Sequence, residues 1–196
     1  MENVTEEPAV KYNHFSPEEY LAMEREATEK HEYYQGEIFV MTGASREHNE
    51  IFSNLFTEIG YKLKGKGCKP YGADFRTHVQ KNTLYTYPDM LIICGEPELT
   101  DNHFDTVTNP SVIIEILSKS TRDYDIGKKF MLYRDIPSLK EYIVVDSEKM
   151  FVQNNTKIAD KSWQMTEYNE ADESLIINTV QIGISLKDIY KAVTFK

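Results

Sequence analysis

The stretch "NPSVIIEILSKST", residues 109–121, decides which fold this chain adopts. Its run of apolar, β-branched residues predicts a buried strand, yet Glu115 stands in the middle of that run. Moving an unpaired carboxylate out of water costs several kcal/mol. We therefore expect Glu115 to be neutralised, paired with a cationic side chain or bound to a metal ion, and the rest of the chain has to supply the partner.

Two further apolar runs predict strands beside this one: "MLIICG" at 90–95 and "EYIVVD" at 141–146. A helix is expected from Asp123 to Arg134, so the segment between the strands at 112–117 and 141–146 is long enough for a right-handed parallel crossover. Within the first of these strands, Glu115 shares its face with Ile113 and Leu117, because side chains alternate. We predict an α/β fold, that is, a central mixed sheet flanked by helices.

The N-terminal third predicts a helix, a hairpin and a second helix. Ser16 with Glu19 forms a capping box for a helix that continues to about His31, and a β-hairpin turns around residues 35–36. Ser45 caps a second helix over 46–64, where apolar residues recur at helical spacing. After residue 150 we expect a peripheral antiparallel meander and a short final helix.

Length and charge restrict the kind of protein. At 196 residues we expect one domain, with its core at about 15–150 and the meander and short helix at 151–196. A net charge of −10 counts against a protein that coats nucleic acid non-specifically, but it permits a local site or a carboxylate cluster that holds a divalent cation.

The cysteines and the N-terminus bear on location. Cys68 and Cys94 belong to no CxxC pair, so we expect neither a zinc ribbon nor a redox motif, and a reducing cytoplasm fits best. The first ten residues are acidic and lack an apolar core, and no stretch approaches a membrane span. We expect no secretion signal and no membrane anchor.

A second carboxylate, Asp89, follows Pro88 where the chain enters the strand at 90–95. If that strand pairs with the one that carries Glu115, the two acids converge at one edge of the sheet. Mg²⁺ or Mn²⁺ is commonly held by one or two carboxylates together with water and phosphate oxygens, which favours phosphodiester hydrolysis. The purely structural alternatives are a buried ion pair for Glu115 and an ordinary turn for Asp89.

A lysine near the acids would assist the attacking water. Leu117 stands two residues beyond Glu115, where such a lysine could have been. In the next helix along the chain, Lys129 falls on the inward stripe with Phe130 and Tyr133, so we prefer it, and Lys119 is the rival. Taken alone, Lys129 is expected to be an ordinary helix lysine whose ammonium group stays in water.

Several blocks of the sequence resemble a known family. "YPDMLIICGEPE", "NPSVIIEILSKSTRDYDIGKKFMLY" and "EYIVVD", with "YYQGEIFVMTGASREHNEIFSNL" upstream, are similar to the Uma family of restriction endonucleases in the PD-(D/E)XK nuclease superfamily. The resemblance covers about residues 15–150. It implies a restriction-endonuclease-like fold and metal-dependent cleavage of DNA.

Carried over by position, the resemblance implies that Asp89 and Glu115 hold the metal and that Lys129 is the migrated catalytic lysine. Lys119 stands where a proline is more typical of the family, so the lysine's placement stays open. Glu37 and His48 match recurring family positions, which puts them at the rim of the site.

The remaining expectations concern partners. Among the residues of "YGADFRTHVQ" (71–80), we expect Arg76 to contact phosphate. A homodimer is favoured because two sites related by a two-fold axis cut both strands most simply. Two alternatives remain: a catalytically inactive nucleic-acid-binding or regulatory module of the same fold, and a hydrolase that acts on RNA or another phosphoester.

Overall fold

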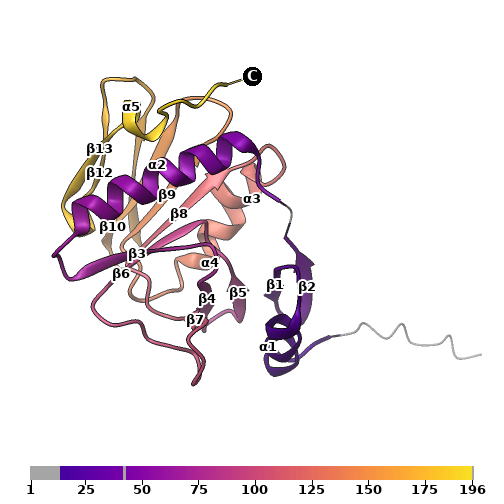
Figure 1. Cartoon of the computed structure of the whole chain (residues 1–196). Coiled ribbons are helices and arrows are strands. Elements are labelled where there is room, and N and C mark those ends of the chain that lie inside the picture. The colour runs from indigo at the N-terminus through magenta and orange to yellow at the C-terminus, as the bar shows by residue number, and fades with distance from the viewer. Residues whose placement is uncertain (1–13, 42, 196) are drawn as a thin grey trace, which may run out of the picture.

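The computed structural model describes residues 14–41 and 43–195, and its centre is a six-stranded mixed sheet (Figure 1). Residues 1–13, where the sequence predicts no secretion signal, lie outside the described residues. The sheet has the strand order β11-β10-β9-β8-β6-β3. Its strands are β3 (Cys68–Gly72), β6 (Met90–Cys94), β8 (Val112–Leu117), β9 (Glu141–Asp146), β10 (Val152–Ala159) and β11 (Ser162–Tyr168). Strands β8 and β9 are parallel and the other pairs antiparallel, which confirms the predicted mixed sheet.

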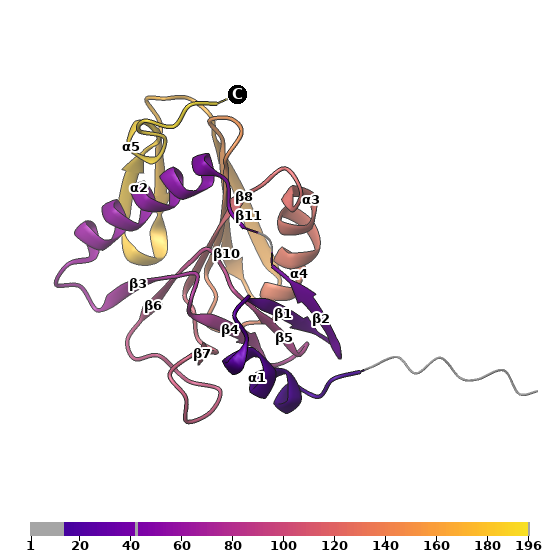
Figure 2. The same ribbon diagram turned by 45° about the vertical axis from the view of Figure 1, so that its right-hand side comes forward.

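Helices cover both faces of this sheet, as Figure 2 shows with α2 on one side of β8 and α3 and α4 on the other. On the side of α2 (Arg46–Leu63), Ile114 and Ile116 belong to one apolar core. On the opposite face, Ile113 and Leu117 belong to a second core. The predicted alternation along β8 is confirmed, and Glu115 faces the second layer.

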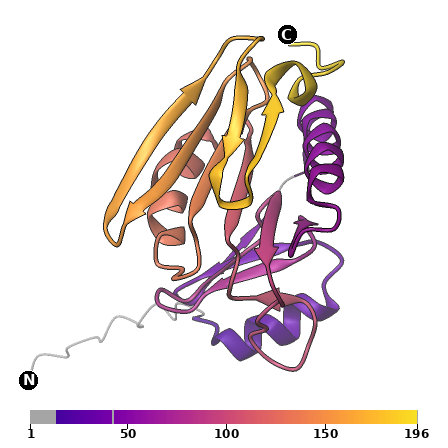
Figure 3. The ribbon, with the colours of Figure 1, turned by 90° about the vertical axis from the view of Figure 1, so that its left-hand side faces the viewer.

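A second, five-stranded sheet has the order β2-β1-β5-β4-β7. It carries the N-terminal elements, which lie in the lower part of Figure 3. Its strands are β1 (His31–Tyr34), β2 (Glu37–Val40), β4 (Arg76–Val79), β5 (Leu84–Thr86) and β7 (Thr106–Val107). Helix α1 (Pro17–Glu26) packs on it through a cluster of tyrosines and Leu21. The sheet thus fixes the α1–β1–β2 segment beside the main core.

The predicted helix start and hairpin are confirmed. The Ser16 hydroxyl accepts the Glu19 N–H at 3.2 Å, and the Glu19 carboxylate accepts the Ser16 N–H at 2.7 Å. Gln35 and Gly36 both have positive φ, at 49° and 94°, as a two-residue turn of the primed type requires. Helix α1 ends at Glu26 rather than near His31, because His31 already pairs in β1.

The segment after β8 is helical but irregular. It consists of α3 (Arg122–Tyr124), the π-helix η1 (Asp125–Lys129) and α4 (Phe130–Tyr133), where the sequence predicts one regular helix. A π-turn carries one residue more than an α-helical turn. Asp125 and Lys129 both lie buried here, at 4% and 6% exposure.

The C-terminal region differs partly from the prediction of a peripheral meander. Strands β10 and β11 extend the central sheet beside β9. Only β12 (Ser174–Ile177) and β13 (Ile182–Ser185) form a separate antiparallel pair. The 3₁₀ turn η2 (Asn178–Val180) joins them, and the final helix α5 (Leu186–Ile189) begins at its Ser185 cap.

The two cysteines correct an expectation. Cys68 of β3 lies opposite Cys94 of β6, with 3.9 Å between their Cα atoms, and the two form a disulfide. The cysteine pattern therefore no longer favours a reducing compartment. Within residues 14–41 and 43–195, no helix combines the length and the apolar character that crossing a membrane requires.

Candidate active site

A cavity of about 320 Å³ lies where the β1–β2 hairpin, the segment before α2, the end of β8 and the α3–η1 turn meet. Four carboxylates line it, together with one lysine and one histidine. These residues are Glu32, Asp89, Glu115, Asp125, Lys129 and His48. They come from five separate segments of the chain, so only the folded molecule assembles this group.

Asp89 and Glu115 converge as the pairing of their strands requires. Met90 lies opposite Ile114 in the antiparallel β6–β8 pair, which puts Asp89 beside Glu115. The Asp89 N–H donates to Glu115 Oε2 at 3.4 Å, and Asp89 Oδ2 accepts the Ile116 N–H at 2.7 Å. Both carboxylates are thereby fixed by main-chain contacts at one end of the cavity.

Lys129 is the partner that a buried Glu115 demands. Its Nζ lies 3.0 Å from Glu115 Oε1, 3.2 Å from Glu32 Oε1 and 3.6 Å from Asp125 Oδ1. The Tyr133 hydroxyl also donates to Glu115 Oε1, at 2.9 Å. The buried carboxylate is therefore paired and hydrogen-bonded, which is the condition for tolerating its burial.

The charge of the cavity is not balanced, because four carboxylates face a single ammonium group. Burial raises the pKa of Glu115, Lys129 opposes this effect, and the charges of Asp89 and Asp125 add to it. Burial also raises the pKa of Asp125. For Lys129, burial acts against the charged form, but the nearby carboxylates outweigh it and raise its pKa well above the usual value. The excess of negative charge suits a bound cation.

His48 lies at the start of α2 and contacts Asp89, with 3.1 Å between Nε2 and Oδ1. The imidazole is largely buried, and its Nδ1 has no hydrogen-bond partner within the described part of the chain. The side chain that orients Asp89 thus keeps one nitrogen unused. His48 lines the cavity. From the sequence we expect it at the rim of the site.

Comparison with known proteins now identifies the family. The family model Uma2, described as "Putative restriction endonuclease", matches residues 17–188. The chain belongs to the Uma2 family. Two relatives from Synechocystis sp. PCC 6803 carry the name "Uncharacterized protein": sll1609 is 40% identical over 149 residues, 76% of this chain and 84% of that protein. The second, slr1290, is 31% identical over 98% of this chain and 100% of its own length.

A solved structure supports the fold of this Uma2-family chain. It is described as a putative nuclease belonging to DUF820 from Anabaena variabilis ATCC 29413, and it superimposes with a TM-score of 0.74. The match covers 90% of this chain and 98% of the other at 17% identity. At that identity the likeness establishes the nuclease-like fold and leaves the reaction to the site itself.

Two residues expected at this Uma2-family site lie elsewhere. Glu37 is exposed at the start of β2 and does not line the cavity. Lys119 is exposed in the loop after β8 and lines a separate cavity of about 200 Å³ with Glu47 and Glu148. Lys129, not Lys119, contacts Glu115.

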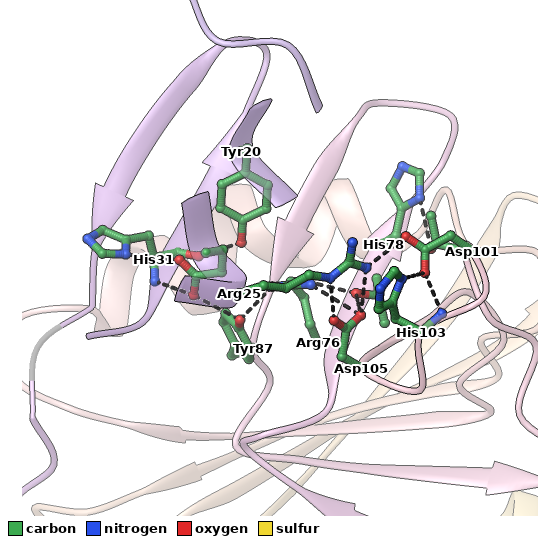
Figure 4. Close-up of polar contacts among 12 residues, drawn as sticks. Tyr20, Arg25, His31, Arg76, His78, Tyr87, Asp101, His103 and Asp105 are labelled. Atoms are coloured by element: carbon green, nitrogen blue, oxygen red, sulfur yellow. Dashed lines mark hydrogen bonds and ion pairs between the residues drawn. The ribbon is translucent and has the colours of Figure 1, made fainter. Parts of the chain in front are cut away.

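Arg76 contradicts the expectation of a phosphate contact. It is 2% exposed, and its guanidinium donates to the Tyr87 hydroxyl at 2.8 Å and to Thr106 Oγ1 at 2.9 Å. Figure 4 shows it between Tyr87 and Asp105, and its Nη2 lies 3.3 Å from Asp105. The guanidinium is committed to neighbours inside the fold because α1 and β7 cover it.

Sequence reasoning missed Glu32 and Asp125. Glu32 lies in a short strand next to a turn, where a charged residue is ordinarily solvated. The two-residue turn makes Glu32 and Phe39 cross-strand partners, and this register turns Glu32 rather than Glu37 toward Lys129. Asp125 lies four residues before Lys129, a spacing that could have pointed to it.

Proposed function

We propose that the protein is an endonuclease that hydrolyses DNA phosphodiester bonds with the help of Mg²⁺ or Mn²⁺. One observation carries the proposal: Asp89, Glu115 and Lys129 converge on one cavity in a chain of the Uma2 family with a nuclease-like fold. Restriction-endonuclease-like proteins are typically metal-dependent, and a pair of convergent carboxylates fits that chemistry.

The donors present fit a hard divalent ion. Asp89 and Glu115 would hold it, since both carboxylates reach the same end of the cavity. Within the part of the chain that the structure describes, no group of three or more His, Cys, Asp or Glu side chains is arranged to hold a metal. Two protein ligands are what Mg²⁺ often takes, with water and substrate oxygens completing its shell.

The other residues would orient the reacting groups. When bound, the ion would supply Lewis-acid polarisation of the phosphate and a more acidic water. Lys129, held by three carboxylates, would keep its ammonium beside the attacking water and the developing negative charge. Tyr133 would fix the Glu115 carboxylate, and His48 would fix Asp89.

Cleavage of supercoiled plasmid and of a labelled single-stranded oligonucleotide, with Mg²⁺ or Mn²⁺, tests the proposal. Wild type is compared with Glu115→Gln and Lys129→Ala, and Glu37→Gln is the control because Glu37 does not line the cavity. We expect Glu115→Gln and Lys129→Ala to lose cutting, with Mn²⁺ affinity weakened chiefly in Glu115→Gln. Equal cutting by all four proteins would overturn the assigned residues, and no cutting by wild type would overturn the function.

A second candidate is a nucleic-acid-binding module that does not turn over substrate. The observation that favours it is that Lys129 already balances the charge of Glu115 by direct contact. Gel shift separates the two functions. A protein that shifts DNA and leaves every substrate intact with either metal would be the binding module.

The proposal extends to assembly and location. Cutting both strands of a duplex would use a homodimer, and size-exclusion chromatography with light scattering tests it. A nuclease that acts on cellular or invading DNA would work in the cytoplasm. Under that assignment the Cys68–Cys94 pair should be found reduced in protein trapped from intact cells with an alkylating agent.

A further inference from the structure

An exposed aromatic ring stands at the cavity beside the acids. Phe39 of β2 is 47% exposed and lines the cavity together with Val40, which is 62% exposed. Phe39 is the cross-strand partner of Glu32, and directly opposed residues of an antiparallel pair project on the same face of the sheet. Glu32 contacts Lys129 at 3.2 Å. The ring of Phe39 therefore lies on the face of the hairpin that is turned toward the ammonium and the carboxylates.

Among the described residues, the lysines and arginine next to the cavity lining in the sequence make other contacts. Three basic residues are immediate sequence neighbours of the lining residues. Arg122 is bonded to Asp146 at 2.6 Å and to Glu148 at 3.3 Å, and Lys119 shares its cavity with Glu148. The third, Lys128, lies over the ring of Tyr34 at 5.2 Å. Arg122 is thus already paired, and a net charge of −10 counts further against broad contact with the phosphates of a duplex.

The volume of the cavity is suited to a small ligand. At about 320 Å³ it is at the lower end of pockets that take small molecules. Its lining holds two kinds of group, the carboxylates with Lys129 and the exposed apolar side chains Phe39 and Val40 of β2. A nucleotide also has two kinds of group, because a charged phosphate is joined to an apolar, stackable base. Base–aromatic stacking contributes affinity with any base sequence, and it requires an unpaired base.

We infer that the site takes a single unpaired DNA strand and that Phe39 holds a base of that strand by stacking while the adjacent phosphate lies at the carboxylates. This inference rests on the proposed function and names its substrate class. Phe39 is then a specificity-determining residue that touches substrate but not the reacting phosphate.

Binding without turnover tests the ring directly. A single-stranded oligonucleotide that contains 2-aminopurine is titrated with wild-type protein in Ca²⁺, and quenching of its fluorescence reports stacking. We expect Phe39→Leu, which keeps an apolar side chain without an aromatic face, to bind about tenfold more weakly and to lose the quenching. Phe39→Tyr should restore both. Tyr61→Ala is the control, because Tyr61 is 78% exposed and does not line the cavity.

Cleavage of matched substrates tests the strand preference. The same sequence is offered as single-stranded DNA, as blunt duplex and as RNA, and we expect the single strand of DNA to be cut at least tenfold faster than the other two. Phe39→Leu should raise KM for the single strand and change kcat little, since the ring does not contact the reacting atoms.

Each failure has its own meaning. Duplex cut as fast as the single strand, or RNA cut faster than DNA, would overturn the inference and leave phosphodiester hydrolysis standing. Unchanged binding and quenching in Phe39→Leu would overturn the role of the ring. If no substrate is cut, the proposed function fails, and the 2-aminopurine titration, which needs no turnover, still decides whether Phe39 stacks on a base.

Discussion

Two groups of charged side chains, each built around a buried cation, lie in this molecule, and only one of them has the character of a site. The group around Arg76 joins α1 to β4 and β7: Arg76 bonds Tyr87, whose hydroxyl donates to Glu24 at 2.8 Å, and Asp105 pairs with Arg25 at 2.7 Å (Figure 4). The group around Lys129 sets four carboxylates against one ammonium. In the first group, which we call closed, each of these charged side chains has partners within the fold. The second, which we call open, has four carboxylates to one ammonium and faces a cavity.

The contrast shows that burial of charge alone does not mark function. Arg76 is more deeply buried than Lys129, at 2% against 6% exposure, and yet its partners lie within the fold. What distinguishes the Lys129 group is an excess of negative charge beside a cavity. Such a group is expected to change when a cation is added, whereas the Arg76 group is expected to change only when one of its members is removed.

The largest effect should come from breaking the closed group. Arg76→Leu leaves Glu24 and Asp105 without its charge, and we expect a loss of about 3–5 kcal/mol in the free energy of unfolding, measured with urea. Arg25→Leu removes a partly exposed partner of the same Asp105 and should cost about 1 kcal/mol. Equal small losses in both would mean that the Arg76 group does not act as a closed network.

Adding a cation should affect only the open group. Mg²⁺ or Mn²⁺ at about 100 times its dissociation constant should stabilise wild type by about 2.7 kcal/mol, seen as a rise in Tm. Asp89→Asn should lose this rise because it removes one of the two proposed ligands. Glu24→Gln, in the closed group, should keep the rise although its starting Tm is lower. A rise of the same size in Asp89→Asn would place the ion elsewhere.

Destabilising helix α1 should affect the closed group and leave the group around Lys129 unchanged. Ser16→Ala removes the hydroxyl that accepts the Glu19 N–H, and loss of such a cap costs about 1 kcal/mol. Hydrogen exchange should increase in Pro17–Glu26, which supplies Tyr20 and Glu24. Amides of β8 should keep their protection, and faster exchange there would show that the two groups are mechanically coupled.

The smallest effect concerns pH and His78, which stacks on Tyr85 beside the closed group. Burial and the charge of Arg76 lower the pKa of His78 to about 4, below its ordinary value of 6.5. Between pH 6.5 and pH 4 the unfolded chain therefore binds more protons, so this residue's contribution to stability is lost as the pH falls through that window. His78→Gln should flatten the fall in unfolding free energy between these values. The change should be small because the ring is partly exposed and solvent screens its charge. Parallel curves for the two proteins would contradict the assignment.

Local signals in the sequence predict much of this fold. The Ser16–Glu19 capping box, the helical repeat over 46–63 and the alternation in β8 are confirmed, because each depends on neighbours a few residues away. The convergence of Asp89 with Glu115 followed from one strand pairing.

The features that the sequence did not predict depend on distant partners. Burial of Arg76 needs Tyr87, 11 residues on, and Asp105, nearly 30 residues on, to close around it. Glu32 reaches the site because the hairpin register turns its side chain toward Lys129, which lies far along the chain. The spacing of residues within a single helix or strand predicts neither the burial of Arg76 nor the contact of Glu32 with Lys129.

The π-turn at Asp125–Lys129 makes the site sensitive to residue number as well as residue type. A π-turn fits one extra residue into about the rotation of an α-helical turn, so deleting one residue from it would leave an α-helical turn with the flanking residues close to their present directions. The residues inside the turn, which include Asp125 and Lys129, would be redistributed around the helix. A chain of this kind can therefore lose a codon in this segment and keep its helix, while the two buried charges of the turn change their places relative to Glu115 and the cavity.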